Sequence, residues 1–235
     1  MRDPRALAAH IDVLADEAFP AAHTARLDGW ILRADPGRHR RNRSVWARAG
    51  DGGDGLGDRI ARVQDWYAAH GLPARFQLTP ATRPEGLAEA LAERGYREEG
   101  PSAVWTGSLE LLRAEGAAVS LAERPDRAWL ELTGADAAIL ERVRAPCAYV
   151  RSEVGAARGV LAGEWLGVYE VATVPEARRR GAATRVLAAL AGWARARGAR
   201  RAYMLVEEAN APAHALYTRL GLSRAYRYGY RISSA

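Results

Sequence analysis

Apolar and polar positions recur along this chain in two patterns, one typical of helices and one typical of strands. Apolar residues spaced three or four apart predict helices at residues 4–19, 57–70, 84–94, 126–144, 181–197 and 211–220. Runs rich in β-branched and aromatic residues predict strands at residues 26–34, 43–49, 74–79, 102–108, 147–154, 157–162, 165–174, 201–206 and 225–232. Together they predict an α/β fold built on mixed sheets, of the α+β type.

The second half of the chain repeats the order of the first. WYAAHGLPARFQL, from Trp66, aligns with WARARGARRAYML, from Trp193, 127 residues later. Gly95 and Gly221, 126 residues apart, align in the helix–strand pair that follows. Each copy therefore reads helix, glycine, strand, helix, glycine, strand, although two amphipathic units can also resemble each other by chance. The predicted lobes are residues 1–112 and 113–235, with the boundary in residues 109–118.

Charge and composition exclude some classes of function. The 34 basic residues are all arginine against 28 acidic ones, and the formal net charge is +6. The absence of lysine from the sequence excludes Schiff bases and a Walker-type phosphate lysine. A positive balance suits a polyanionic ligand or a nucleic acid. Nucleic-acid binders usually gather their charge in a stripe, whereas these arginines are spread along the chain, so no nucleic-acid partner is expected.

The remaining composition predicts a cytoplasmic protein without a membrane partner. No apolar run approaches the ~18 residues of a membrane span, and the N-terminal stretch looks like an amphipathic helix rather than a signal peptide. Cys147 is the single cysteine, so no internal disulfide is possible. No metal is expected, because the histidines lack metal-ligand spacing. These are His10, His23, His39, His70 and His214.

The stretch VPEARRRGAAT, residues 174–184, joins a predicted strand to a predicted helix. The first N–H groups of a helix lack internal partners and carry partial positive charge, so a phosphate fits there. Small residues let phosphate oxygens approach the backbone, and flanking arginines add charge. These residues are Gly181, Ala182 and Ala183, and Arg178, Arg179 and Arg180. The stretch therefore indicates a pyrophosphate cradle, with a solvated basic turn as the alternative.

This stretch resembles the acyl-CoA-binding motif of the GNAT superfamily of N-acetyltransferases, Arg/Gln-x-x-Gly-x-Gly/Ala. Arg178, Gly181 and Ala183 occupy its fixed positions. Downstream, NAPAHALYTRLGL resembles the second signature of the superfamily. The matching residues there are Asn210, Leu216, Tyr217, Leu220, Gly221 and Leu222. The resemblance covers residues 115–235 and implies a tandem GNAT-like architecture, two αβ lobes that each have a twisted mixed sheet flanked by helices.

The resemblance implies a binding site for acetyl-CoA in the second lobe. The strand before the loop would splay from its neighbour, and its exposed backbone would hold the pantetheine arm. Those residues are Val171, Ala172, Thr173 and Val174. The loop amides from Arg179 to Thr184 would hold the pyrophosphate. Asn210 would contact the pantetheine, and its alternative, compatible role is a helix N-cap.

Two residues are candidates for acid–base work. An amine must lose a proton before it attacks the acetyl carbonyl, and Glu170 is the candidate base. The alternative for Glu170 is a strand carboxylate paired with an arginine. The resemblance places Tyr217 near the thioester sulfur as proton donor. Ala213, Leu216 and Leu220 are expected to form the buried apolar stripe of this helix, with Tyr217 beside it. The alternative for Tyr217 is a core tyrosine.

The first lobe resembles a degenerate copy of the second. Its loop AGDGGDGLG carries a G-x-G-x-x-G pattern at Gly50, Gly52 and Gly55. A dinucleotide site is not expected, because Asp51 and Asp54 would repel a pyrophosphate. Leu91 aligns with Tyr217, so the proton donor is also missing from this lobe.

Taken together, the sequence predicts an N-acetyltransferase that moves acetyl from acetyl-CoA to a primary amine in a ternary complex. The acceptor is expected to be a small molecule or the terminus of a peptide chain, and the protein a monomer or homodimer. The alternative is a non-catalytic module that binds acyl-CoA or mediates an interaction.

Overall fold

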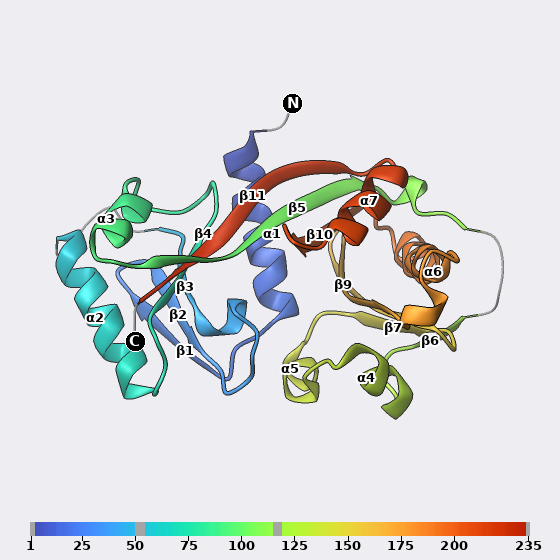
Figure 1. Cartoon of the computed structure of the whole chain (residues 1–235), viewed down its shortest axis with the longest axis horizontal. Helices are drawn as coiled ribbons and strands as arrows, with labels where there is room; N and C mark the ends of the chain where they lie inside the picture. The colour runs from blue at the N-terminus through green and yellow to red at the C-terminus, as the bar shows by residue number, and fades with distance from the viewer. Residues whose placement is uncertain (1–2, 50–54, 115–118, 234–235) are drawn as a thin grey trace. The chain divides into compact units, whose positions relative to one another are not determined.

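The computed structural model describes residues 3–49, 55–114 and 119–233 (Figure 1). The chain forms two compact units, Met1–Ala103 with Tyr226–Ala235, and Val104–Ala225. The border runs through β5 (Arg97–Ser108) and β11 (Ser223–Ile232), because each strand begins in one unit and ends in the other. The lobe border expected from the repeat, between residues 112 and 113, stays a prediction.

The first unit has a mixed sheet in the order β1, β2, β3, β4, β11. Its pairs are antiparallel except β3 with β4, which is parallel. Its other elements are α1 (Pro4–Ala18), β1 (His23–Leu27), β2 (Trp30–Ala34), η1 (a 3₁₀ turn, Arg41–Arg43), β3 (Val45–Ala47), α2 (Leu56–Ala69), β4 (Arg75–Leu78) and α3 (Leu87–Glu93). Trp30, Phe76 and Tyr67 form the centre of its apolar core.

A hairpin replaces the single strand expected over residues 26–34. β1 and β2 pair as antiparallel strands, with Leu27 opposite Trp30. Asp28 and Gly29 have φ angles of 46° and 84°, the left-handed conformation that a two-residue hairpin turn requires. The prediction was wrong because the apolar pattern was read across an Asp-Gly pair, itself a hairpin signal.

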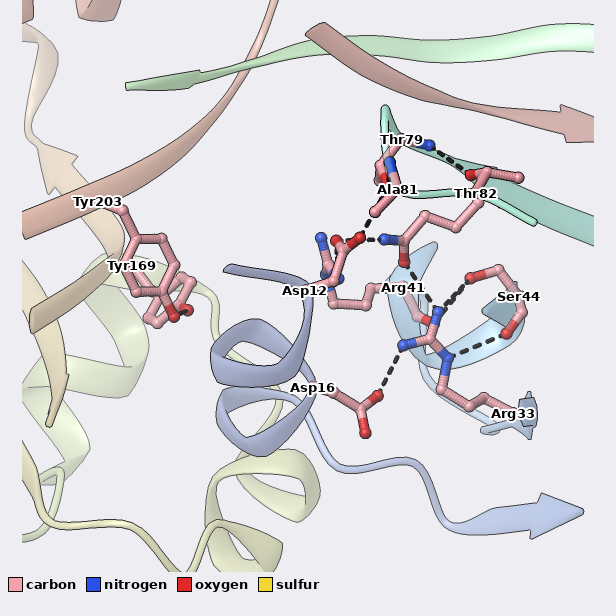
Figure 2. A network of polar contacts seen from close by, with 11 residues as sticks. Asp12, Asp16, Arg33, Arg41, Ser44, Thr79, Ala81, Thr82, Tyr169 and Tyr203 are labelled. Carbon is pink, nitrogen blue, oxygen red and sulfur yellow. Dashed lines mark hydrogen bonds and ion pairs between the residues drawn. The ribbon is translucent and has the colours of Figure 1, made fainter. Parts of the chain in front are cut away.

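A buried polar network lies inside the first unit (Figure 2). The Arg33 guanidinium donates to the Ser44 carbonyl at 3.0 Å, to the Gln77 side chain at 2.9 Å and to Asp16 at 2.7 Å. Asp12 accepts from Gln77 and from Thr79, each at 2.8 Å. Burial of a charge is tolerated when it is paired and hydrogen-bonded, as here. The network thus ties α1 to β2, to the residue before β3 and to β4.

The second unit has a mixed sheet in the order β10, β9, β8, β7, β6. β9 and β10 are parallel, and the other pairs are antiparallel. Its further elements are η2 (Leu109–Leu111), β6 (Ser120–Ala122), α4 (Arg127–Thr133), α5 (Ala137–Arg142), β7 (Cys147–Arg151), β8 (Gly155–Ala162), β9 (Trp165–Thr173), η3 (Pro175–Ala177), α6 (Ala182–Arg195), β10 (Arg201–Glu207) and α7 (Ala211–Arg219).

Helices cover both faces of this sheet, with α6 on one face and α4 and α5 on the other (Figure 1). Residues 126–144 form two short helices rather than the one expected, because α4 ends at Gly134 with φ 65°. Glycine is the usual residue for such a left-handed helix end. On the α4 face, the buried Trp129 stacks edge-on against Tyr149 of β7.

The elements follow the repeat seen in the sequence. α2 begins at Leu56 and α6 at Ala182, 126 residues later, and both helices have 14 residues. β4 and β10 begin at Arg75 and Arg201, which are again 126 apart. The spacing of these helices and strands therefore agrees with the sequence repeat to within one residue.

No helix in the described parts of the chain combines the length and the apolar character needed to cross a membrane.

Candidate functional site

β9 contains a β-bulge at Glu170. Arg158 of β8 lies opposite Tyr169, and Ala156 lies opposite Ala172, so two residues of β9 face one of β8. Glu170 has φ 48°, which is uncommon for a residue with a side chain. Bulges bend a strand and re-aim its side chains, and they are frequent beside active sites. The bulge therefore marks this point of β9 as a candidate site.

The pairing of β9 with β10 ends just before the bulge. Among the described residues, the parallel register runs from Trp165 to Val168, which lies opposite Met204. Past this point β9 stays paired with β8, where Thr173 lies opposite Gly155. The predicted pantetheine-binding stretch therefore lies past the register that β9 shares with β10. Its four residues, Val171, Ala172, Thr173 and Val174, are half-buried.

Glu170 is held by a buried arginine. Arg158 Nε lies 2.7 Å from Glu170 Oε2, and Nη2 lies 3.3 Å from Oε1. The Arg158 side chain is fully buried and that of Glu170 is 10% exposed. Burial acts to lower the pKa of Arg158, but the Glu170 carboxylate, together with smaller contributions from Tyr169 and Tyr149, outweighs it and the pKa is raised. The arginine pairing named as the alternative for Glu170 is thus present, and its role as a base stays a prediction.

Arg158 was missed by the sequence reasoning. It lies in β8, whose sequence is GAARGVLA and whose neighbouring residues are buried. A single charge in the middle of a buried strand needs a partner, which is the signal that would have found it. Among the described residues, that partner is Glu170.

The loop between β9 and α6 has the geometry expected of an anion-binding turn. Arg179 and Gly181 have φ angles of 61° and 81°, and the chain then enters α6 at Ala182. In the described structure no side chain caps α6, so its first N–H groups are left for a ligand or water. A Cβ on Gly181 would lie 3.1 Å from Arg185 Nη1, so a side chain there would crowd the turn. The fit to a phosphate is good.

The other residues of the predicted cradle surround this turn. Arg178, Arg179, Arg180 and Gly181 are exposed, Ala182 is buried, and Ala183 and Thr184 are half-buried. Three exposed guanidinium groups beside an uncapped helix start provide charge where phosphate oxygens would lie. Their contact with a ligand stays a prediction.

Asn210 caps α7. Its side-chain oxygen accepts a hydrogen bond from the Ala213 backbone N–H at 3.2 Å. The N-cap role named for Asn210 is confirmed, and its contact with pantetheine stays a prediction.

Tyr217 is the buried residue of α7, with 4% of its surface exposed. The expected stripe was wrong: Ala213, Leu216 and Leu220 are half-buried, so the helix packs through Tyr217 itself. Burial raises the pKa of Tyr217 to about 12, so its phenol is protonated at neutral pH. Its hydroxyl has no hydrogen-bond partner among the described residues, and its ring lies 6.1 Å from that of Trp105.

Two further expectations concern the G-x-G-x-x-G pattern of the first lobe and the binding of a metal. Gly55, the last glycine of the G-x-G-x-x-G pattern, precedes α2, whereas Gly50, Gly52 and the two aspartates lie outside the described residues. Across residues 3–49, 55–114 and 119–233, no cluster of three His, Cys, Asp or Glu side chains could hold a metal ion.

Comparison with known sequences assigns the chain to a family. Residues 9–231 match the family described as "Probable histone acetyltransferase Rv0428c C-terminal". The chain belongs to this family. The match spans both units, so the two are parts of one family pattern. The family lies in the GNAT superfamily, as the two motifs of the second lobe indicate.

Individual relatives agree with this assignment. The "Uncharacterized N-acetyltransferase YobR" of Bacillus subtilis is 28% identical over 257 residues, covering 94% of this chain and 97% of the relative. A GCN5-related N-acetyltransferase structure from Kribbella flavida has a TM-score of 0.71 at 16% identity, covering 97% of this chain and 96% of that chain. A tandem GNAT protein of clavulanic acid biosynthesis has a TM-score of 0.58 at 15% identity, covering 95% and 87%. These structures show that the tandem GNAT fold is shared.

Proposed function

We propose that this protein transfers an acetyl group from acetyl-CoA to a primary amine by direct attack in a ternary complex. The observation that carries the proposal is the path from the bulge of β9 through Gly181 to the uncapped start of α6. Small residues, free amides and three arginines there fit a pyrophosphate. Membership in the family supports the same activity.

In this proposal the chain itself binds and orients the donor. The backbone of Val171 to Val174 would hold the pantetheine arm, and the amides from Arg179 to Thr184 would hold the pyrophosphate. When bound, acetyl-CoA supplies the acetyl thioester. Backbone N–H groups near Val171 or Ala172 would stabilise negative charge on the carbonyl oxygen.

Two protons have to move during the reaction. Glu170, directly or through a water molecule, is the candidate group that takes a proton from the amine. Burial raises the pKa of the Tyr217 phenol to about 12, so the phenol carries a proton at neutral pH. This is the state needed to protonate the departing sulfur. Because its hydroxyl has no hydrogen-bond partner among the described residues, the proton can be given without breaking an internal bond.

The acceptor is proposed to be a small molecule or the terminus of a peptide chain, and the site of action the cytoplasm. The family description names a histone acetyltransferase, so a histone peptide is a further candidate acceptor.

The second candidate function is a module that binds acyl-CoA without catalysis. We also propose that the protein is a monomer or homodimer and that it binds neither nucleic acid nor membranes.

Thioester consumption with a panel of amines tests the proposal. The panel contains small amines, peptides with free N-termini and a histone peptide. We expect at least one amine to accelerate release of free thiol from acetyl-CoA. Binding of acetyl-CoA with no acceleration by any amine would instead support the non-catalytic module.

Tyr217→Phe tests the proton donor. The substitution keeps the buried ring and removes only the hydroxyl, so acetyl-CoA affinity should change little. General-acid help is worth about 10²–10⁴-fold, and a thiolate leaves readily, so we expect kcat to fall roughly 10–100-fold. The measurements are kcat in the pre-steady state and acetyl-CoA binding by calorimetry. An unchanged chemical step would show that Tyr217 is a core residue without a catalytic role.

A further inference from the structure

Trp105 and His214 form a hydrogen-bonded pair beside Tyr217. The indole Nε1 of Trp105, on β5, lies 3.0 Å from Nδ1 of His214, on α7. The two ring centroids are 5.7 Å apart. His214 precedes Tyr217 by three residues, about one helical turn, and the Trp105 ring also lies 6.1 Å from the Tyr217 ring. All three residues belong to the unit Val104–Ala225.

The chemistry of the pair assigns one tautomer to His214. An indole N–H can only donate, so Nδ1 of His214 must accept and carry no proton. The proton of the neutral ring is then on Nε2, which lies 3.1 Å from the Glu207 backbone carbonyl and donates to it. Glu207 is the last residue of β10. His214 therefore links α7 to β5 on one side and to the end of β10 on the other.

Among the described residues, α7 itself buries little of its surface. Tyr217 is its buried residue, its N-cap Asn210 is exposed, and its apolar stripe is half-buried. The Tyr217 hydroxyl makes no hydrogen bond among the described residues, so the ring is oriented by packing, in which the Trp105 ring takes part. A small rotation of α7 would move the hydroxyl, because nothing described at its own end holds it.

We propose that Trp105 and His214 are positioning residues that hold α7, and with it the Tyr217 hydroxyl, in place for proton transfer. The proposal rests on the proposed role of Tyr217. It adds Trp105, which lies outside the two GNAT motifs in the part of the chain predicted as the first lobe. It also adds His214, which lies within the second signature but is not one of its matching residues. Misplacement of a catalytic group by about 1 Å can lower a rate about 100-fold.

Three single variants separate positioning from general structure. Trp105→Phe removes the donor and keeps an aromatic ring, His214→Leu removes the acceptor, and His214→Asn keeps an acceptor near the Nδ1 position. We expect kcat to fall about 10-fold or more in the first two and much less in His214→Asn. The dissociation constant of acetyl-CoA should stay within about a factor of two, since neither residue lies in the loop before α6. Equal losses in His214→Asn and His214→Leu would overturn the hydrogen bond as the cause.

The Tyr217→Phe background supplies the decisive comparison. If Trp105 acts through the Tyr217 hydroxyl, Trp105→Phe has no further effect on kcat once that hydroxyl is gone. Such coupling is the sign of residues that act as a unit. An equal additional loss in the Tyr217→Phe background would overturn the proposal, while the acetyltransferase activity itself would stand. His70→Leu is the matched control, because His70 is an exposed histidine that stacks on Trp66 in the first unit; we expect unchanged kcat.

A readout independent of activity keeps the two proposals separate. Nitrogen NMR of labelled His214 should show an unprotonated, hydrogen-bonded Nδ1 and a protonated Nε2, and Trp105→Phe should shift the Nδ1 signal. The ring signals of Tyr217 should move in Trp105→Phe and His214→Leu and stay close to wild type in His214→Asn. A Tyr217 ring that is insensitive to all three variants would overturn the positioning role, even if no amine is acetylated and the proposed function fails.

Discussion

The buried position of Arg158 and the orientation of Glu170 are both explained by the ion pair between them. A fully buried guanidinium is tolerated because a carboxylate lies 2.7 Å from it, and the bulge in β9 presents that carboxylate. The same bulge gives Glu170 a φ of 48°. Backbone strain of this kind is often found at functional sites. Glu170 therefore has two roles at the residue scale: it makes a stabilising ion pair, and it is the candidate catalytic base.

Glu170→Ala should therefore destabilise the protein. Removing one partner of a buried ion pair costs about 3–5 kcal/mol, because the remaining charge loses its compensation. Urea unfolding of the wild type and the variant measures the difference in the free energy of unfolding. The double variant Arg158→Met/Glu170→Ala is the control, since removal of both charges should restore much of the stability. Wild-type stability in Glu170→Ala would contradict the importance of the pair.

The element that organises the site is the strand–loop–helix segment from β9 to α6. The register with β10 ends at Val168, the bulge follows at Glu170, and two left-handed residues, Arg179 and Gly181, turn the chain into α6. Among the described residues the register with β10 does not continue past Val168 and no side chain caps α6, so backbone groups at both places are left for a ligand or water. Under the proposed function, binding would thus depend on backbone geometry more than on any one side chain.

Gly181→Glu should abolish tight binding of acetyl-CoA, because it fills the turn and adds a negative charge. Loss of one charge-assisted contact costs about 1.5–3 kcal/mol, a factor of about ten or more in affinity. Calorimetry with acetyl-CoA measures the change. The matched control is Gly198→Glu, because Gly198 has a similar φ of 88° after the other end of α6, with no atom within 4 Å of an added Cβ. Affinity within about threefold of wild type in Gly181→Glu would place the cradle elsewhere.

At the scale of the whole molecule, the two units share an order of helices and strands. They differ in the residues that stand at corresponding positions. Ser44 stands 126 residues before Glu170, and Gln77 lies in β4, which begins 126 residues before β10. In the first unit the Arg33 guanidinium bonds to both Ser44 and Gln77. These buried protein groups link β2 to the residue before β3 and to β4.

One molecule of acetyl-CoA should therefore bind per chain, in the second unit. The corresponding strands of the first unit are joined by a buried network, and Leu91, which aligns with Tyr217, is a fully buried core residue. Calorimetry at known protein concentration measures the stoichiometry. Two equivalent sites would contradict the prediction. Gly181→Glu serves as the control, because it should remove the measured site without revealing a second one.

Much of the local structure follows from the sequence, because it depends on residues close together in the chain. Helical spacing and a following glycine predicted α2 and α6, and Asn210 was a recognisable N-cap. The loop around Gly181 was also predictable, since a strand followed by small residues and arginines leads directly into a helix. The hairpin at Asp28 and Gly29 had an equally local signal that was overlooked.

Other features were decided only by the tertiary structure, because they join residues far apart in the chain. The bulge is a property of the register between β8 and β9, and Arg158 meets Glu170 only through that register. Trp105 and His214, 109 residues apart, meet only when β5 and α7 pack. Sequence periodicity specifies which face of a strand is buried, but the partner opposite each residue depends on strand pairing. The sequence by itself determined most of the elements and the turn before α6; the packing of distant elements determined which side chains surround Glu170 and Tyr217.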